Sequence, residues 1–316
     1  MANFINEKGR ISISSDEDGS RLDRMLLRSL GNEKRTLIMR LIRKGNVRVN
    51  GKRCKVDYRL QVNDEVFVPA SLRQNDVKEV CKGDIPAFLL RQVEQMPILF
   101  EDEWLLVIDK PAGLVVHGGS GHEAGLIEAL KVSRDLPDLR LAHRLDRDTS
   151  GVLLLAKSLQ ALRTLTESFR ERDMDKTYLA WVQGHPEPHA ARMKSKLSKG
   201  VSIAGERMVV DDDEGKESVT DYQVVLECEE AGFDYAMVAL KPHSGRTHQL
   251  RVQLQNEGHA ILGDPKYAEK ETLKKFKVLG GKGLMLHAWR LRLLHPITQQ
   301  MLVFTAPFPK RMIDFL

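Results

Sequence analysis

The feature that most constrains the fold of this chain is a segment of high charge density that runs directly into an apolar segment. Residues 143–151 read His-Arg-Leu-Asp-Arg-Asp-Thr-Ser-Gly, and residues 152–156 read Val-Leu-Leu-Leu-Ala. A short apolar run that adjoins turn residues is typical of a buried strand. The pattern therefore predicts a catalytic loop at the edge of a central strand. A charged turn, in which carboxylates pair with Arg144 and Arg147, is the structural alternative.

Residues 143–151 resemble the His-Arg-Leu-Asp-x-x-Thr-Ser-Gly motif of the RluA-type pseudouridine synthases. Enzymes of this family isomerise uridine to pseudouridine within RNA. The resemblance implies that Asp146, the first aspartate of the motif, is the catalytic residue. It also implies that no cofactor and no metal are needed, because the reaction neither oxidises nor hydrolyses its substrate.

Further segments extend the resemblance over nearly the whole chain, from Ser20 to about Pro309. Residues 109–119 resemble the first motif of the family, and residues 286–291 match a C-terminal motif. Residues 176–180 resemble the motif whose tyrosine lies against the target base. Residues 242–252 resemble the motif whose final arginine pairs with the catalytic aspartate. The resemblance thus implies three residues that support catalysis: Tyr178, Arg251 and its neighbour Leu250.

Each of these supporting residues also has a structural explanation. Tyr178 lies in an apolar run and could be a core residue, while Arg251 could be an exposed surface charge. The alternation of Leu250, Val252 and Leu254 suits a strand, but the spacing of the two leucines also suits a helix capped by Thr247. The sequence leaves this choice open.

Positive charge is concentrated near the N-terminus. Residues 21–59 hold thirteen Lys and Arg against three Asp and Glu, a net charge of +10, whereas the whole chain carries +5. The remainder of the chain is therefore net acidic. So dense a basic segment is typical of a nucleic-acid partner, although a solvated charged face would look similar.

The basic segment has the order of elements of a small RNA-binding module. Apolar spacing predicts helices over residues 22–30 and 37–44, and Asn50-Gly51 predicts a tight turn in a hairpin. The segment from Ser20 to Pro69 resembles the S4 RNA-binding domain, which implies contacts with structured RNA through phosphate and shape. The residues expected to form its RNA-binding patch are Arg35, Arg40, Arg43, Lys44, Arg48, Lys52 and Arg53.

The chain is expected to have an α+β fold. We predict an N-terminal extension (1–19), an S4 domain of two helices and a small sheet (20–70), a linker (71–97) and a catalytic domain (98–316). Short apolar runs beside turn residues, interrupted by a helical pattern over residues 159–172, predict a mixed, mainly antiparallel sheet with flanking helices in the catalytic domain. A hairpin is predicted over residues 98–108, and a short helix around 88–93.

Several classes of protein are disfavoured. No apolar run approaches the roughly 20 residues of a membrane span, and the N-terminus lacks the pattern of a signal peptide, so we expect a cytoplasmic protein. Three cysteines without a Cys-x-x-Cys pair are expected to be reduced thiols. His243 and His248 lack the spacing of a zinc motif, and no phosphate-binding glycine motif is present. We expect a monomer.

The predicted function is isomerisation of specific uridines in 23S ribosomal RNA or in the assembling large ribosomal subunit. A stacked uridine must be flipped out before reaction, and Arg144 is the predicted residue that enters the vacated stack. Asp146 would attack C1′ or remove a proton from C2′, and the sequence does not choose between these. Three alternatives are a family member acting on another helix of that RNA, a non-catalytic S4-type RNA chaperone, and a glycosylase using Asp146 and Asp148.

Overall fold

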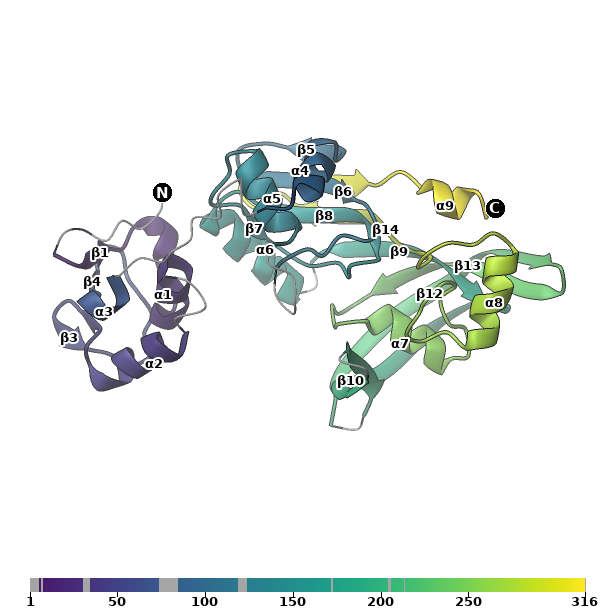
Figure 1. The fold of residues 1–316 in the computed structure, drawn as a ribbon, viewed down its shortest axis with the longest axis horizontal. Helices are drawn as coiled ribbons and strands as arrows, with labels where there is room; N and C mark the ends of the chain where they lie inside the picture. Colours follow the sequence, from purple (N-terminus) through teal and green to yellow (C-terminus); the bar gives the residue numbers. More distant parts are fainter. Residues whose placement is uncertain are drawn as a thin grey trace.

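A computed structural model describes most of the chain in two parts (Figure 1). The described residues are 6, 8–30, 35–73, 85–118, 124–171, 173–203, 206–212 and 214–315. A small helical part with a short sheet is formed by the N-terminal residues, and a larger part is built on a long twisted sheet. The predicted α+β class, with a small module before a larger mixed sheet, is confirmed.

The small module forms the two predicted helices and a sheet. Among its described residues the strand order is β1-β4-β2-β3, with antiparallel pairing throughout. Its elements are β1 (Arg10–Ser12), a 3-10 turn (Ser15–Glu17), α1 (Leu22–Leu30), α2 (Arg35–Lys44), β2 (Arg48–Val49), β3 (Lys52–Arg53), β4 (Glu65–Phe67) and α3 (Ala70–Arg73). The predicted turn at Asn50-Gly51 has positive φ at both residues, 50° and 75°, which suits a two-residue hairpin loop.

The core of the module is built from the apolar faces of its own helices and strands. Leu22, Met25 and Leu26 of α1 are fully buried against Ile38 and Ile42 of α2 in one cluster. Strand β1, which lies in the predicted N-terminal extension, joins the sheet through β4 and adds apolar side chains to this cluster. The module's sheet therefore takes in residues before position 20.

The basic side chains predicted for RNA binding lie on the outside of this core. They alternate in the sequence with the apolar residues of α2 and the β2–β3 hairpin, so the apolar residues face inward and the charges face solvent. All seven are exposed: Arg35, Arg40, Arg43, Lys44, Arg48, Lys52 and Arg53. The module thus presents exposed cations on both α2 and the β2–β3 hairpin.

The larger part contains one sheet with eleven strands among the described residues. The order is β11-β10-β12-β13-β9-β14-β8-β6-β5, with β15 paired to β14 and β7 to β8. The strands are β5 (Ile98–Glu101), β6 (Leu105–Lys110), β7 (Arg140–Leu141), β8 (Ser150–Ala156), β9 (Asp175–Gln183), β10 (Ala190–Ile203), β11 (Glu206–Asp211), β12 (Lys216–Glu230), β13 (Phe233–Pro242), β14 (Leu286–Leu294) and β15 (Met301–Thr305). The predicted hairpin over 98–108 is confirmed as β5–β6.

Helices flank the sheet. Those described are α4 (Ala87–Glu94), α5 (Leu126–Ser133), α6 (Leu159–Glu171), α7 (Gln249–Asn256), α8 (Lys270–Val278) and α9 (Lys310–Ile313). In Figure 1, α4, α5 and α6 lie by the strands nearest the small module, while α7 and α8 lie by the other half of the sheet. The helices predicted near 88–93 and 159–172 are confirmed as α4 and α6, apart from Arg172, which lies outside the described residues.

The apolar segment that follows the charged motif forms an interior strand of the sheet, β8. All seven residues of β8 are buried, between β6 on one side and β14 on the other. Among the described strands, β8 and β14 are the one parallel pair, and they meet over two residues, Ser150 opposite His287 and Gly151 opposite Ala288. Gly151 has φ +112°, and a Cβ there would lie 2.2 Å from the carbonyl oxygen of Ala288. Glycine is therefore required for this close approach of the two strands.

Apolar clusters on the two halves of the sheet meet near Tyr178. One cluster surrounds the fully buried Trp181, and another joins α4 and α5 to β6 and β8. Tyr178 packs against both clusters. Strand β9 thus places this side chain where the two halves of the sheet come together.

The small module contacts the larger part of the chain through α6. The guanidinium of Arg163 donates a hydrogen bond to the hydroxyl of Ser20 at 2.8 Å. No helix in the described part of the chain is long and apolar enough to cross a membrane. Cys54 and Cys228 are free thiols, whereas Cys81 lies outside the described residues.

Candidate active site

The charged motif forms the loop predicted from the sequence, and a buried lysine holds it. The loop runs from β7 into β8, with Asp146 four residues before the strand begins. The ammonium of Lys110, at the end of β6, donates to the carbonyl oxygens of Pro111, Arg147 and Thr149, each at 2.9 Å. The Lys110 side chain is fully buried. Lys110 therefore joins the part of the loop that leads into β8 to the end of β6.

The surroundings of Lys110 shift its pKa in two opposite directions. Burial lowers the pKa of Lys110 to about 7, while the nearby carboxylates of Asp148 and Asp146 act in the opposite direction. Three carbonyl acceptors match the three N–H donors of an ammonium group, whereas a neutral amine could satisfy only two of them. The hydrogen-bond geometry therefore suits the charged form.

Replacing Lys110 with Met is expected to loosen the loop. Three buried carbonyl oxygens would lose their donor, and buried unsatisfied groups cost about 1–3 kcal/mol each, partly offset by removal of the buried charge. We expect a stability loss on the order of 2 kcal/mol, measured by urea denaturation, together with reduced turnover. Unchanged stability would show that water or a neighbouring group replaces the lysine.

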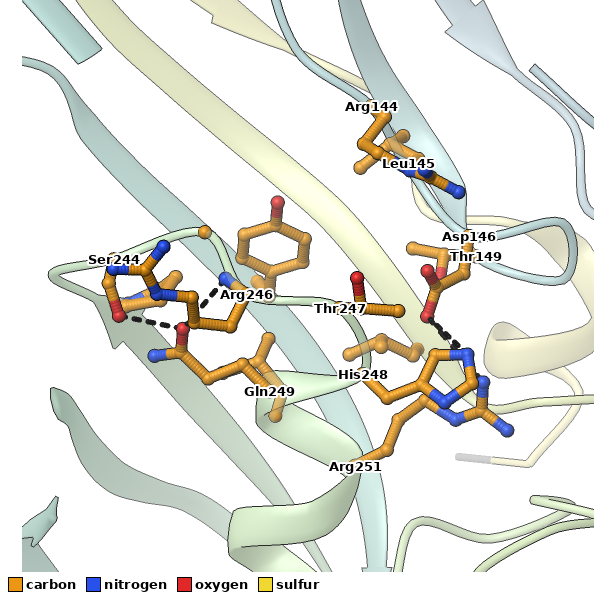
Figure 2. Close-up of a pocket in the computed structure, with 15 residues that line it drawn as sticks. Arg144, Leu145, Asp146, Thr149, Ser244, Arg246, Thr247, His248, Gln249 and Arg251 are labelled. Carbon is orange, nitrogen blue, oxygen red and sulfur yellow. Dashed lines mark hydrogen bonds and ion pairs between the residues drawn. The ribbon is translucent and has the colours of Figure 1, made fainter. Parts of the chain in front are cut away.

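Arg251 lies beside Asp146, as the sequence predicts, but its strongest contacts are with another carboxylate. One guanidinium nitrogen lies 3.5 Å from the Asp146 Oδ2 atom. The other two donate to Asp264 in a bidentate pair, with both distances 2.7 Å. Arg251 is 4% exposed and Asp264 is fully buried. Figure 2 shows the side chains of Asp146, His248 and Arg251 converging on one another. Asp264 thus fixes the arginine that faces the carboxylate of Asp146.

The open choice at residues 250–254 is resolved as a helix. Arg251 and Leu250 lie in the first turn of α7, and the residue before the helix is His248, which has φ 54°. Thr247 is therefore not the capping residue. Burial opposes the charge on Arg251, yet its hydrogen bonds and charge interaction with Asp264 raise the pKa of Arg251 above its ordinary value. The guanidinium remains charged inside the domain.

His248 and Tyr267 complete the surroundings of the aspartate. The Nε2 atom of His248 lies 3.7 Å from the Asp146 Oδ2 atom, and its Nδ1 atom is 2.8 Å from the Tyr267 hydroxyl. Burial lowers the pKa of His248, which favours the neutral ring. The ring of Tyr267 also lies 5.1 Å from the Arg251 guanidinium. Asp264, Tyr267 and Lys110 were not predicted to be site residues from the sequence, and for His248 the sequence raised only a metal site, which its spacing disfavours.

These side chains line a pocket between the catalytic loop, β9 and the segment that leads into α7. Asp146, Tyr178, Leu250 and Arg251 all line it, and exposed Arg144 lies at its edge. Burial, followed by the charge of Asp146, raises the pKa of Tyr178, so its phenol is neutral. The five site residues predicted for the catalytic domain therefore meet in one cavity.

The second carboxylate of the motif lies in a different environment. Asp148 is not among the described residues that line the pocket, and both of its oxygens accept hydrogen bonds from exposed Arg147 at 3.1 Å. Among the residues that the structure describes, no group of three or more His, Cys, Asp or Glu is placed to bind a metal ion. The pocket thus offers one carboxylate, paired with one arginine and set against an aromatic ring.

Comparison with known proteins connects this geometry to a family. A family model described as RNA pseudouridylate synthase matches residues 104–256, and one described as the S4 domain matches residues 20–66. The chain is 44% identical over 308 residues to ribosomal large subunit pseudouridine synthase C of Pasteurella multocida, covering 97% of this chain and 92% of the relative. The chain belongs to the RluA-type RNA pseudouridine synthases. The resemblance inferred from the sequence motifs is confirmed.

Further relatives support this assignment of the synthase. The chain is 41% identical over 306 residues to ribosomal large subunit pseudouridine synthase C of Haemophilus influenzae, and the match covers 96% of this chain and 92% of the relative. Among solved structures, human RNA pseudouridylate synthase domain containing 4 is 29% identical, with a TM-score of 0.57, covering 72% of this chain and 94% of that one. Human RNA pseudouridylate synthase domain containing 1 is 28% identical, with a TM-score of 0.58, covering 69% and 85%. The synthase therefore has relatives along nearly its full length.

Proposed function

We propose that this synthase isomerises specific uridines of 23S ribosomal RNA, free or in the assembling large subunit, and acts in the cytoplasm as a monomer. The two ribosomal relatives described above are both named ribosomal large subunit pseudouridine synthase C, the RluC type. The observation that carries the proposal is the carboxylate of Asp146, placed in a pocket beside Tyr178 and against buried Arg251. The exposed cations of the S4 module supply the affinity for RNA.

The reaction breaks one bond and forms another with no net gain or loss of atoms. The bond from ribose C1′ to uracil N1 breaks, the uracil turns within the pocket, and its C5 atom joins C1′. The proton on C5 is lost and N1 ends protonated. Asp146 begins the reaction either as a nucleophile at C1′ or as a base that removes the proton from C2′. Either step requires an ionised carboxylate within reach of the ribose.

The surrounding side chains have separate tasks in this scheme. Arg251, locked by Asp264, gives the Asp146 carboxylate a fixed orientation through their 3.5 Å contact. Tyr178 stacks on the flipped uracil, since it lines the pocket and packs against both halves of the sheet. The walls of the pocket retain the free base between the two bond changes.

Arg144 is proposed to take the place of the uridine in the RNA stack. It is exposed at the edge of the pocket, two residues from Asp146, and its planar guanidinium can stack on bases or bind phosphate. Arg144→Ala should slow the modification of structured RNA by about tenfold or more, because flipping a paired base costs a few kcal/mol. Single-turnover rates on a helical substrate and on a flexible loop would measure this. Equal losses on both substrates would contradict the role in base flipping.

Tritium release tests the proposed function directly. RNA labelled at C5 of uridine loses its label when C5 bonds to C1′, so the full-length protein should release tritium from 23S ribosomal RNA transcript and not from free nucleotide. Release of free uracil would indicate the glycosylase, and tight binding without release would indicate the RNA chaperone. Mapping of the modified positions would distinguish RluC-like site choice from that of an RluD-like family member, which acts on another helix of 23S ribosomal RNA.

A further inference from the structure

A second hollow lies beside the active-site pocket and shares Pro242 with it. Its walls come from three elements that are far apart in the sequence: Phe169 from α6, Lys176 from β9, and Lys241 and His243 from the end of β13. Lys176 and Tyr178 are two residues apart on β9, so both point to the same face, about 6.8 Å apart along the strand. The hollow therefore continues the face on which the target base is proposed to bind.

Lys176 in this hollow is a partly buried cation, and no carboxylate of the described residues pairs with it. Its ammonium lies 5.6 Å from the centre of the Phe169 ring. Burial lowers the pKa of Lys176, and no neighbouring carboxylate within the described part of the chain acts against this effect. A desolvated ammonium that lacks an anion is costly to maintain in a fold, and a bound anion would offset that cost.

The other charged groups around the hollow already have partners, with one exception. Asp175 lies 3.7 Å from Arg292, and the Nε2 atom of His243 donates to the carboxylate of Asp221 at 2.7 Å. Asp221 is also held by Arg192 in a bidentate pair. Exposed Lys241 adds a second positive charge at the rim. The hollow is therefore positively charged and adjoins the catalytic pocket.

We propose that this hollow binds the RNA phosphate next to the target uridine, with Lys176 as the principal contact and Lys241 at the rim. The proposal rests on the function proposed above and deepens it. A phosphodiester group is the anion that an RNA strand must bring close to Tyr178 whenever its base enters the pocket. Lysine suits such a contact as a flexible point charge. The site would anchor the backbone while the base is flipped.

Salt dependence of RNA binding tests the contact. Each neutralised phosphate contributes about 0.7–0.9 to the slope of log affinity against log salt. In full-length protein carrying Asp146→Asn, which prevents turnover during the titration, Lys176→Met should reduce that slope on 23S ribosomal RNA transcript by about 0.7. Lys277→Met, which removes an exposed lysine of α8, is the matched control and should leave the slope unchanged. Lys176→Arg retains the charge and should preserve the slope.

Thermal unfolding separates this role from a structural one. Because Lys176 is partly buried without an anion, Lys176→Met should leave the melting temperature unchanged or raise it. A lower melting temperature together with an unchanged salt slope would overturn the proposal and make Lys176 a structural residue.

A neutral linkage in the RNA locates the contact. Once tritium release has identified the target uridine, a methylphosphonate can replace the phosphodiester on either side of it. At one of these two positions, the methylphosphonate should weaken RNA binding by the protein that retains Lys176. The same methylphosphonate should not weaken binding by the Lys176→Met variant, because the lysine and the phosphate are partners in one interaction. Equal losses with both proteins at both positions would overturn the proposal. Absence of tritium release would instead count against the proposed function, and the salt slopes would still report on Lys176.

Discussion

Asp146→Asn is expected to abolish pseudouridine formation while leaving RNA binding intact. The amide has nearly the shape of the carboxylate, so the pocket keeps its form, but it can neither attack C1′ nor take a proton from C2′. We expect tritium release to fall by at least about 10³-fold, the scale typical of losing a positioned base or nucleophile. The dissociation constant for 23S ribosomal RNA transcript, measured at one fixed salt concentration, should change by less than about twofold.

Asp148→Asn is the matched control, because it makes the same chemical change two residues away. Asp148 pairs with exposed Arg147 and is not among the described residues lining the pocket. Most of the activity should therefore remain. If the two substitutions lowered tritium release equally, the assignment of Asp146 as the catalytic residue would be wrong, and the two-carboxylate glycosylase would regain support.

Asp264→Ala is expected to cause the largest loss of stability of any single substitution in the site. It leaves the guanidinium of Arg251 buried without its bidentate partner, and breaking a buried ion pair costs about 3–5 kcal/mol. Urea denaturation followed by tryptophan fluorescence would measure this loss, with Trp181 in the core as one reporter. Turnover should also fall, because Arg251 would no longer be held against Asp146.

The double variant Arg251→Met, Asp264→Leu tests the physical origin of that loss. Removing both charges leaves no uncompensated ion, and apolar replacements of a buried pair are often neutral for stability. The double variant should therefore be more stable than Asp264→Ala yet remain poorly active, since Asp146 has lost its arginine. A double variant as unstable as Asp264→Ala would mean that packing volume, rather than charge, determines the loss.

The parts of the fold that follow from local pattern could be predicted from the sequence. Helices α1, α2 and α6 have apolar residues at helical spacing, and the turn at Asn50-Gly51 has residues that tolerate positive φ. The apolar run that became β8 was long and uninterrupted enough to predict a buried strand. The strand order of the sheet could not be predicted in this way, because β14 and β8 are separated by more than a hundred residues and pair over only two.

For the site as well, residues in sequence motifs could be predicted, whereas residues that depend on contacts between distant segments could not. Asp146, Tyr178 and Arg251 lie in motifs that carry the family resemblance, and the structure brings them to one pocket. Asp264 lies in none of these motifs, and Lys110 lies in the segment that resembles the first motif without any indication of its role. Each acts through groups supplied by other segments of the fold. The spacing of the apolar residues around Leu250 fitted both a helix and a strand, so the choice between them depended on tertiary structure.

The self-contained core of the small module makes RNA recognition and chemistry separable. Its apolar cluster is formed by residues 11–72 alone, and the pocket around Asp146 takes no residue from it. A chimera could therefore exchange this module for the corresponding one of another synthase without repacking the catalytic core. Substrate choice in such a protein can change by modular replacement, while the isomerisation chemistry is inherited unaltered.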